Sequence, residues 1–313
     1  MTSLGDCDRA FVRLPEGLLH YRHAGWPSPP GSTVVAGHAG AVGRGGVASG
    51  ALDGGPGKLP PLWMMHASPA SSRSTEPLAL ALAARHGRAI VAPDTPGNGD
   101  SAPLAVPQPE VADYADAFVR ALDALGIAQA DLYGYHTGAH VAIEMAIAHP
   151  SRVRRLVLDG LLWLEDEAER ADYLAHYAPP LVPDANGTQV FTALQFIRDM
   201  AWFFPHFRRD AAHNLRGGAM PPELLHTLTV DLLKAATTYH LAYRAVFRHR
   251  LESRLPRLAA HPVLLMADAT DPTRPGVTRA AALVPGARQV VIEDGWSPQG
   301  LAGKAQTIAD FLA

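Results

Sequence analysis

The 313-residue sequence contains one cysteine, few charged residues and no long apolar run. The single cysteine, Cys7, cannot form an internal disulfide. Charged residues make up 18% of the chain, the net charge is -3 and no stretch is a basic run, which argues against binding nucleic acid through its phosphates. No apolar segment reaches the length of a membrane span. These absences argue against nucleic acid and a membrane as partners.

The first residues, 1–13, carry acidic side chains and no apolar segment of the kind found in a secretory leader. Together with the lone cysteine, this predicts a cytoplasmic location. Cys7 lies in this polar stretch, outside any strand–turn–helix context, so we do not expect it to be a nucleophile. We expect a monomer or a homodimer.

Strand and helix patterns alternate along most of the chain. Two short extended runs around a Pro-Glu-Gly turn predict an antiparallel hairpin, and continuous apolar runs from residue 62 onward are typical of strands buried on both faces. The expected strands are 10–14, 18–23, 62–66, 89–92, 131–135, 153–158, 262–267 and 288–292, and the expected helices are 76–86, 110–125, 137–148 and 300–312. The alternation predicts an α/β fold with a mostly parallel, doubly wound sheet.

Two segments interrupt this alternation. Residues 27–60 are dominated by Gly, Pro, Ala and Ser, and we interpret them as a flexible insertion with a brief strand at 34–36. Residues 161–258 are rich in aromatic residues and histidine and have helical periodicity, for example over 223–247. The expected organisation is a core made of residues 1–160 and 259–313, with residues 161–258 as a helical cap over the carboxyl ends of the strands.

The stretch Gly134-Tyr135-His136-Thr137-Gly138 joins an expected strand to an expected helix. It has the form of a nucleophile elbow, in which small residues two before and two after the central position let strand and helix pack closely. The central residue is usually Ser, and here it is a histidine. This pattern predicts the fold more firmly than it predicts the reaction.

Four segments, taken in their order and spacing, resemble α/β-hydrolase-fold proteins of the lipase, esterase and dehalogenase type with a helical cap. Residues 65–69 resemble the His-Gly turn that supplies an oxyanion-hole amide, and 91–101 resemble the Asp-x-Pro-Gly-x-Gly-x-Ser segment. The third segment is the elbow, and the fourth is 264–272, where the family places its catalytic acid, here Asp271. The resemblance spans most of residues 62–313 and implies a hydrolase that needs no cofactor.

The sequence departs from this family at two positions of the catalytic triad. His136 occupies the elbow in place of Ser, Cys or Asp. The family's base lies after the last strand, where this chain has Asp294-Gly295-Trp296-Ser297, and no histidine follows His261. The chain therefore has no Ser-His-Asp triad of the usual kind.

A histidine at the elbow has a definable chemistry. The elbow holds its residue in a strained conformation, usually with positive φ, where His is one of the few enriched non-Gly residues. An apolar pocket and the positive end of the following helix are expected to keep His136 neutral at pH 7. Facing the backbone N–H groups of Thr137 and of Ala67 or Ser68, a neutral imidazole is a base opposite an oxyanion hole.

This arrangement suits hydrolysis of an ester, a lactone or a C–C bond in a small hydrophobic carbonyl compound, and we rank His136 as a base above His136 as a nucleophile. Lyase or isomerase chemistry by proton abstraction is an alternative, and a non-catalytic, ligand-binding pseudoenzyme is another. A further alternative keeps esterase chemistry on one of three serines near the oxyanion turn, Ser68, Ser71 or Ser72.

The remaining site predictions concern the surroundings of His136. Asp271 is the expected orienter of the imidazole, and Asp159 is the alternative acid. The predicted pocket residues are His66, Tyr135, Trp163, Trp202 and Trp296. Asp94 is expected to be structural. His136, His140 and Glu144 have helical spacing that suggests a metal, but no Glu follows His136 directly as in zincins, so we predict no metal site.

Overall fold

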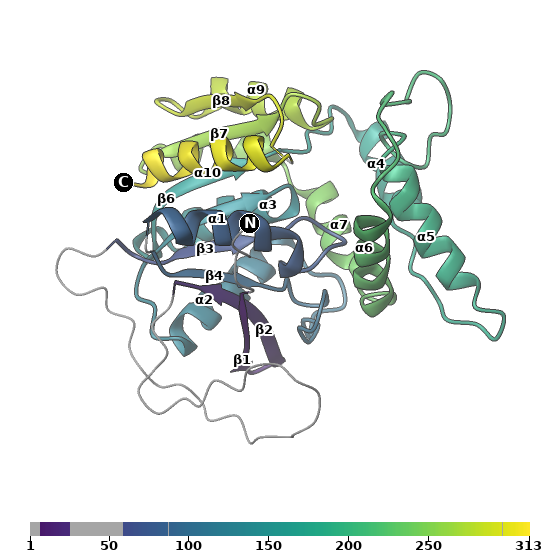
Figure 1. The fold of residues 1–313 in the computed structure, drawn as a ribbon, viewed down its shortest axis with the longest axis horizontal. Helices are drawn as coiled ribbons and strands as arrows, with labels where there is room; N and C mark the ends of the chain where they lie inside the picture. The colour runs from purple at the N-terminus through teal and green to yellow at the C-terminus, as the bar shows by residue number, and fades with distance from the viewer. Residues whose placement is uncertain (1–6, 26–58, 87, 296) are drawn as a thin grey trace.

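An eight-stranded sheet forms the centre of the computed structural model, which describes residues 7–25, 59–86, 88–295 and 297–313 (Figure 1). The strands are β1 (Asp8–Leu14), β2 (Gly17–Ala24), β3 (Leu62–Met65), β4 (Ile90–Pro93), β5 (Ala130–Tyr135), β6 (Val153–Asp159), β7 (Val263–Asp268) and β8 (Arg288–Ile292). Their order across the sheet is β1-β2-β4-β3-β5-β6-β7-β8. The predicted hairpin and all the predicted strands from residue 62 onward are present.

Strand direction follows the predicted α/β pattern. β1 pairs antiparallel with β2, and β2 pairs antiparallel with β4. From β4 to β8 every neighbouring pair is parallel. Because parallel strands end at the same edge of a sheet, the turns after β3, β4, β5, β6 and β7 meet on one side of the molecule, where ligands bind in open α/β sheets.

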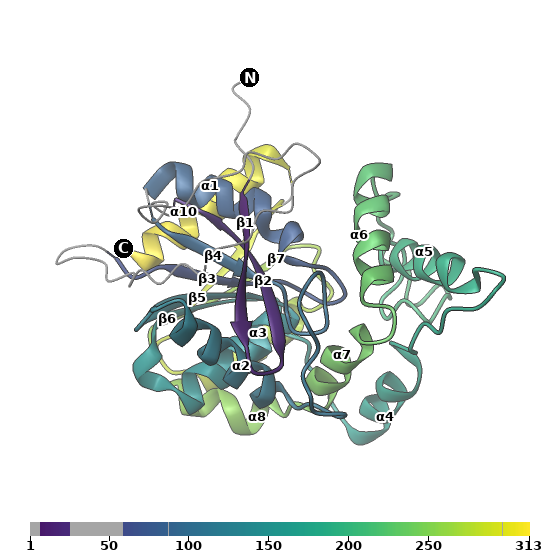
Figure 2. The ribbon, with the colours of Figure 1, turned by 90° about the horizontal axis from the view of Figure 1, so that it is seen from below.

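Helices cover both faces of the sheet (Figures 1 and 2). The helices of the α/β core are α1 (Glu76–His86), α2 (Val111–Ala124), α3 (Thr137–Ala148), α9 (Arg274–Leu283) and α10 (Pro298–Leu312). α1 packs against α10 on one face, and α2 packs against α3 on the other. A short 3₁₀ turn, Ser72–Thr75, leads into α1, and its N-cap is Ser71.

The continuous apolar run of β3 is explained by burial on both faces. Trp63 and Met65 belong to the core cluster beneath α2 and α3, whereas Leu62 and Met64 belong to the cluster beneath α1 and α10. Successive side chains of a strand point to opposite faces, so a strand covered on both sides needs apolar residues at every position. The result is a rigid central strand whose carboxyl end carries the turn at residues 66–69.

The segment between β6 and β7 is helical, as predicted. It contains α4 (Glu167–His176), α5 (Thr188–Met200), α6 (Pro222–Lys234), α7 (Tyr239–Arg248) and α8 (Leu251–Arg254). In Figure 1, α4, α5 and α6 stand to one side of the sheet, and α7 lies nearer the core. The periodicity of residues 223–247 predicts one helix, but two helices are present. The break comes at Thr238, whose hydroxyl donates to the carbonyl of Gly97 at 2.5 Å and fixes the chain to the core.

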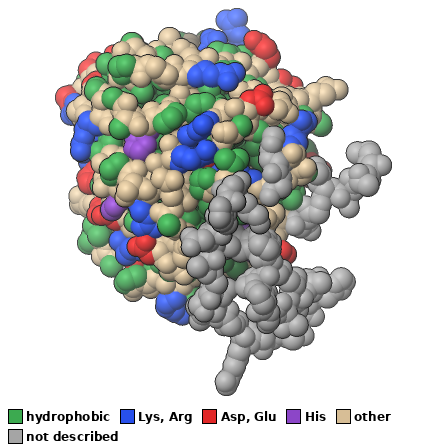
Figure 3. All heavy atoms as spheres, turned by 90° about the vertical axis from the view of Figure 1, so that its left-hand side faces the viewer, with side chains coloured by type: hydrophobic (Ala, Val, Ile, Leu, Met, Phe, Trp, Pro, Cys, Tyr) green, Lys and Arg blue, Asp and Glu red, His purple; other side chains and the backbone are tan. Residues whose placement is uncertain are grey.

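Several sequence expectations fall on residues outside the described ranges. Most of the expected insertion at 27–60 and the expected strand at 34–36 lie there. Within the described part of the chain, no helix is both long and apolar enough to span a membrane. Figure 3 shows the side of the molecule away from α4 to α6, where charged side chains of both signs are scattered among apolar ones.

Candidate active site

The strand–turn–helix at the end of β5 has the geometry of a nucleophile elbow. His136 lies between β5 and α3 with φ 48° and ψ -105°, a conformation that non-glycine residues adopt rarely. A Cβ at Gly134 would lie 2.3 Å from the carbonyl oxygen of Gly138, and a Cβ at Gly138 would lie 2.3 Å from that of Met65. Both glycines are therefore required for α3 to pack this closely on the sheet.

The imidazole of His136 is hydrogen-bonded to a carboxylate. Its Nε2 lies 2.7 Å from Oδ2 of Asp271, which follows β7. The side chain of Asp271 is only 3% exposed, whereas that of His136 is 29% exposed. The pair therefore joins a buried acid to a histidine that solvent or a ligand can still reach.

The direction of the pKa shift of His136 differs from the sequence expectation. Burial acts to lower the pKa of His136, but the charge of Asp271 and its hydrogen bond outweigh burial, and the pKa is raised above its ordinary value. The expectation that the pocket and the helix dipole keep this imidazole neutral is therefore wrong in direction. Burial likewise acts to raise the pKa of Asp271, yet His136 and Thr273 together lower it to about 2.

The hydrogen bond also fixes which ring nitrogen is available. An ionised carboxylate only accepts hydrogen bonds, so Nε2 of His136 must carry the proton that is shared with Asp271. In the neutral ring the lone pair then lies on Nδ1. Nδ1 makes no hydrogen bond to any residue that the structure describes. The free base of this site is thus Nδ1 of His136.

Asp271 is itself held from its other oxygen. Its Oδ1 accepts hydrogen bonds from the backbone N–H and the hydroxyl of Thr273, both at 2.7 Å. This turn after β7 keeps Oδ2 directed at the imidazole. The sequence analysis missed Thr273, although an Asp followed two residues later by Thr is a common local hydrogen-bonding pattern that would have indicated it.

Asp159, the alternative acid, does not contact the imidazole. Its buried carboxylate accepts a hydrogen bond from the hydroxyl of Tyr133 at 2.6 Å and pairs with Lys304 at 2.7 Å. Asp268 also pairs with Lys304, at 3.3 Å. The charge of Asp159 nevertheless contributes to the raised pKa of His136. Of the two acids, only Asp271 is within hydrogen-bonding distance of the ring.

The predicted oxyanion turn lies against the elbow, but its amide is already used. The N–H of Ser68 donates to Oγ1 of Thr137 at 3.2 Å, and the carbonyl of Ser68 accepts from the hydroxyl of Tyr243 at 2.7 Å. Ala67 contributes its carbonyl, which accepts from the ring of His66. The sequence assigns Thr137 a role through its backbone N–H, yet its hydroxyl is what ties the turn to the elbow. Tyr243, from α7, was not predicted.

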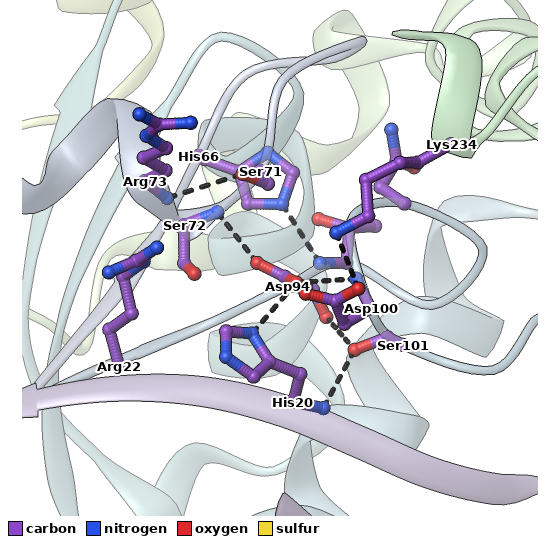
Figure 4. A network of polar contacts seen from close by, with 12 residues as sticks. His20, Arg22, His66, Ser71, Ser72, Arg73, Asp94, Asp100, Ser101 and Lys234 are labelled. Atoms are coloured by element: carbon purple, nitrogen blue, oxygen red, sulfur yellow. Dashed lines mark hydrogen bonds and ion pairs between the residues drawn. The ribbon is translucent and has the colours of Figure 1, made fainter. Parts of the chain in front are cut away.

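His66 and Asp94 hold the oxyanion turn in place (Figure 4). His66 is fully buried; its Nδ1 donates to Ala67, and its Nε2 accepts from the N–H of Thr95 at 2.9 Å. The carboxylate of Asp94 accepts from the N–H of Ser72 at 2.7 Å and from His20 Nδ1 at 2.9 Å. The expectation that Asp94 is structural fits these contacts. Both ring nitrogens of His66, a predicted pocket residue, are engaged by backbone groups.

None of the three serines near this turn forms a nucleophile–base pair. Among the described residues, no hydrogen bond joins Ser68, Ser71 or Ser72 to a histidine side chain. Ser71 donates its hydroxyl to Asp231 at 2.8 Å. The hydroxyl oxygens of Ser68 and Ser72 are buried and have no partner in the part of the chain that the structure describes.

The predicted aromatic pocket residues lie in separate parts of the structure. The ring of Tyr135 stacks on that of His136, with centroids 4.1 Å apart. Trp163 lies after β6, where the guanidinium of Arg279 sits over its ring at 5.8 Å. Trp202 follows α5, and its carbonyl accepts from the N–H of Leu215. Trp296 lies outside the described residues. Only Tyr135 is therefore seen in contact with the His136–Asp271 pair.

The helical spacing of His136, His140 and Glu144 has a structural explanation. His140 is fully buried, and its Nδ1 lies 2.9 Å from Nδ1 of His249, whose Nε2 lies 2.8 Å from Glu144. Burial and the neighbouring His249 lower the pKa of His140 well below its ordinary value. These two residues of α3 thus fasten it to the chain that follows α7.

One group among the described residues has donor atoms close enough to suggest a cation, namely His20, Asp94 and Asp100. His20 and Asp94 are hydrogen-bonded to each other at 2.9 Å, and Asp100 pairs with Lys234 at 2.5 Å (Figure 4). Asp94 also accepts from two backbone N–H groups. The carboxylates are thus already neutralised by protein donors.

The family follows from a match over most of the chain. Residues 60–295 match the family model described as the alpha/beta hydrolase fold. The chain belongs to the α/β hydrolase fold family. Within this family the elbow, the acid after β7 and the turn after β3 meet at the carboxyl edge of the sheet, which is where His136, Asp271 and Ser68 lie here.

Curated relatives within this fold match over part of their length. The 2-hydroxymuconate semialdehyde hydrolase of Pseudomonas sp. (strain CF600) is 48% identical over 73 residues, which are 23% of this chain and 26% of the relative. The 2-hydroxy-6-oxononadienedioate/2-hydroxy-6-oxononatrienedioate hydrolase 1 of Dechloromonas aromatica (strain RCB) is 30% identical over 154 residues, 48% of this chain and 43% of the relative. The matches thus span less than half of either relative.

A solved α/β hydrolase fold structure matches along nearly the whole chain. The enol-lactonase from Burkholderia xenovorans LB400 superposes with a TM-score of 0.64 and covers 97% of this chain and 99% of its own. Its sequence identity of 17% supports a shared fold alone.

Proposed function

We propose that this protein is a cofactor-independent hydrolase of a small hydrophobic carbonyl compound, with His136 as its general base. The supporting observation is the 2.7 Å hydrogen bond between Nε2 of His136 and Asp271, at an elbow residue whose Nδ1 has no partner among the described residues. A histidine that is oriented by a carboxylate and still accessible on its other nitrogen is the usual form of a catalytic base.

In the proposed reaction, Nδ1 of His136 removes a proton from a water molecule while that water attacks the substrate carbonyl carbon. Asp271 stabilises the imidazolium that forms, because its carboxylate stays ionised. The tetrahedral oxyanion then collapses and expels the leaving group, which takes the proton from Nδ1. The balance is one water consumed, one bond to the carbonyl carbon broken, and a regenerated neutral imidazole.

For the oxyanion we assign the backbone N–H of Thr137. The first N–H groups of a helix have no partner within the helix and carry its positive dipole end. Thr137 begins α3 directly after His136, so this donor and the base belong to adjacent residues. The amide of Ser68 is occupied by the Thr137 hydroxyl, so it would contribute only after that bond is exchanged for one to the substrate.

The substrate class is supported by the names of the relatives. Two of them are named hydrolases of a semialdehyde and of oxo-dienedioates, which are carbonyl compounds. We therefore place C–C bond cleavage beside ester and lactone hydrolysis as the reactions to be tried first. In this proposal residues 161–258 act as the cap, which contacts the oxyanion turn through Tyr243.

Turnover of p-nitrophenyl esters, small lactones and a vinylogous 1,5-diketone tests the proposal. We expect His136→Ala to lower kcat/KM by about 10²- to 10⁴-fold, the contribution of a positioned general base. The matched control is His149→Ala, because His149 also bonds an aspartate, Asp116, at 2.7 Å but lies on the surface. That variant should keep the full rate, and a fluorophosphonate should label no serine.

Two results would contradict this assignment. Undiminished turnover in His136→Ala, together with a covalently labelled serine, would move the chemistry to Ser68, Ser71 or Ser72. Tight binding of a carbonyl compound with no turnover in the unaltered protein would support the non-catalytic, ligand-binding alternative.

A further inference from the structure

A cavity lies apart from the His136–Asp271 pair. It has a volume of about 390 Å³ and is bounded by the segment at residues 107–109, by Leu174 of α4 and by one face of α7. None of its lining residues belongs to the elbow, to the oxyanion turn or to the turn after β7. In Figure 2, α7 lies between α4 and the α/β core. The cavity thus lies where α7 and α4 meet residues 107–109 of the core.

Three basic side chains of α7 line this cavity. His240, Arg244 and Arg248 are spaced four residues apart and therefore lie along one face of the helix. No carboxylate is among the lining residues. Arg248 is neutralised from outside the cavity, because its Nε lies 2.7 Å from the carboxylate of Glu110.

Arg244 is not neutralised in this way. No hydrogen bond or ion pair joins it to any residue that the structure describes, and its Nε is buried without a partner. A buried donor on a charged group costs free energy unless something accepts its hydrogen bond. The cavity thus contains one guanidinium whose charge the described protein leaves uncompensated.

His240 adds a second unpaired donor or acceptor. Its side chain is 9% exposed, and its Nδ1 is buried with no partner among the described residues. Burial, and then the charge of Arg244, lower the pKa of this ring. A neutral imidazole that presents Nδ1–H can donate a hydrogen bond to an anion without first having to gain a proton.

Apart from Gln108, the remaining walls are apolar. Pro107, Leu174 and Leu241 face the same space as the basic side chains. A cavity of this volume is within the range of small-molecule sites, which combine apolar walls with a few polar groups. Arg recognises carboxylate and phosphate groups through two parallel hydrogen bonds.

We propose that this cavity binds a small organic anion, whose carboxylate or phosphate contacts Arg244 and His240 and whose apolar part packs on Leu174 and Leu241. The site is distinct from the catalytic one. Tyr243, on another face of α7, contacts Ser68. The proposal does not depend on the hydrolase assignment.

Calorimetric titration of the full-length protein tests this site. Benzoate and phenyl phosphate are the anionic probes, inorganic phosphate tests the anion alone, and benzamide is the neutral match. We expect benzoate or phenyl phosphate to bind and benzamide to bind at least about tenfold more weakly, since charge-assisted hydrogen bonds exceed neutral ones by that much. The tighter of the two anions identifies the acidic group.

Two arginine variants test where the anion binds. Arg244→Gln should weaken the preferred anion about tenfold or more, whereas Arg250→Gln, which removes the same charge from an exposed pair with Glu167, should not. The melting temperature of Arg244→Gln verifies that it is folded. The proposal is overturned if neither anion binds, if benzamide binds equally well, if both arginine variants behave alike, or if His136→Ala abolishes binding, since that would place the ligand at the catalytic site.

Discussion

His136 combines two positions that are separate in a Ser-His-Asp triad. It stands at the elbow, where the nucleophile stands, and it bonds the acid after β7, which is the usual partner of the base. Its positive φ directs the side chain out of the strand–helix turn, toward the carboxyl edge of the sheet. The result is a two-residue relay in which one ring nitrogen is occupied and the other is available.

In the proposed mechanism, the pH dependence of activity follows from the pKa of His136. The base form must be neutral, and Asp271 raises this pKa above the ordinary value of 6.5, so kcat/KM should rise with pH through a midpoint above 6.5. In Asp271→Asn the stabilising charge is lost while burial remains. We therefore expect the midpoint to move to lower pH, together with a lower rate at the plateau, as measured in pH–rate profiles.

The control for that variant is Asp116→Asn. Asp116 bonds the surface histidine His149 at the same 2.7 Å distance, so removing its charge should leave the profile unchanged. A direct reading comes from the C2–H resonance of His136 in a pH titration. A midpoint that stays in place, or that rises in Asp271→Asn, contradicts the role given to this carboxylate.

Residue types in motif order predicted the positions of the elbow and of the acid after β7. The sequence did not predict the raised pKa of His136, because that shift depends on a 2.7 Å contact between residues 135 positions apart. Tyr243 was missed for a similar reason, since nothing in α7 marks it as the partner of a carbonyl on a distant turn. The engagement of the Ser68 amide is likewise visible only in three dimensions.

At the scale of elements, the turn after β6 fits closely against the elbow. Gly160 has φ +72°, and a Cβ there would lie 2.2 Å from Cδ2 and 2.6 Å from Nε2 of His136. The absence of a side chain at this position therefore leaves the space that the imidazole fills. The turn after β6 therefore packs against the imidazole and keeps it next to Asp271.

Gly160→Ala tests this packing of the turn after β6 on the imidazole. The added methyl group should push the imidazole away from Asp271 and lower kcat/KM by about 10²-fold, the effect of a misplacement near 1 Å. Gly286→Ala is the matched control, because Gly286 has φ +80° but nothing within 4 Å of the added Cβ. It should show the stability cost of positive φ, about 1–2 kcal/mol, with unchanged kinetics. Equal rates in the two variants would rule out a role for this turn in positioning the His136 ring.

The regular elements were predicted well because apolar runs and glycine stops are local signals. Gly126, with φ +69°, follows the end of α2. The break between α6 and α7 was not predicted, because it depends on the hydroxyl of Thr238 reaching Gly97 across 141 positions of sequence. Local periodicity continues through that break and gives no sign of it.

At the scale of the whole molecule, the two ends of the parallel strands differ. The starting end holds structural ion pairs, and the carboxyl end holds the candidate site. β5 begins next to Asp131 and ends at His136, so these residues lie roughly 17 Å apart along the strand. Asp131 is fully buried, and its carboxylate accepts from Arg88 and, at 2.9 Å, from Arg154. Arg154 also donates to the carbonyl of Leu312, which joins the sheet to the end of α10.

Asp131→Ala should destabilise the fold without changing the chemistry. It leaves two guanidinium groups without their buried partner, a loss of about 3–5 kcal/mol in the free energy of unfolding. Asp123→Ala breaks an exposed pair with Arg152 and should cost less than about 1 kcal/mol. Urea unfolding measures both, and kcat/KM of the folded protein should match the unaltered chain. A changed rate in Asp131→Ala would show that the two ends are coupled.

The orientation of the His136 ring restricts the shape of what can react there. Nδ1 is bonded to the ring carbon next to Cβ, so it is the nitrogen nearer the main chain, while the outer nitrogen is committed to Asp271. If Nδ1 removes the proton, the reacting atom must descend almost to the backbone of the turn. Slender or planar molecules, and water itself, meet that requirement, whereas a centre crowded by branches is kept away by its own bulk.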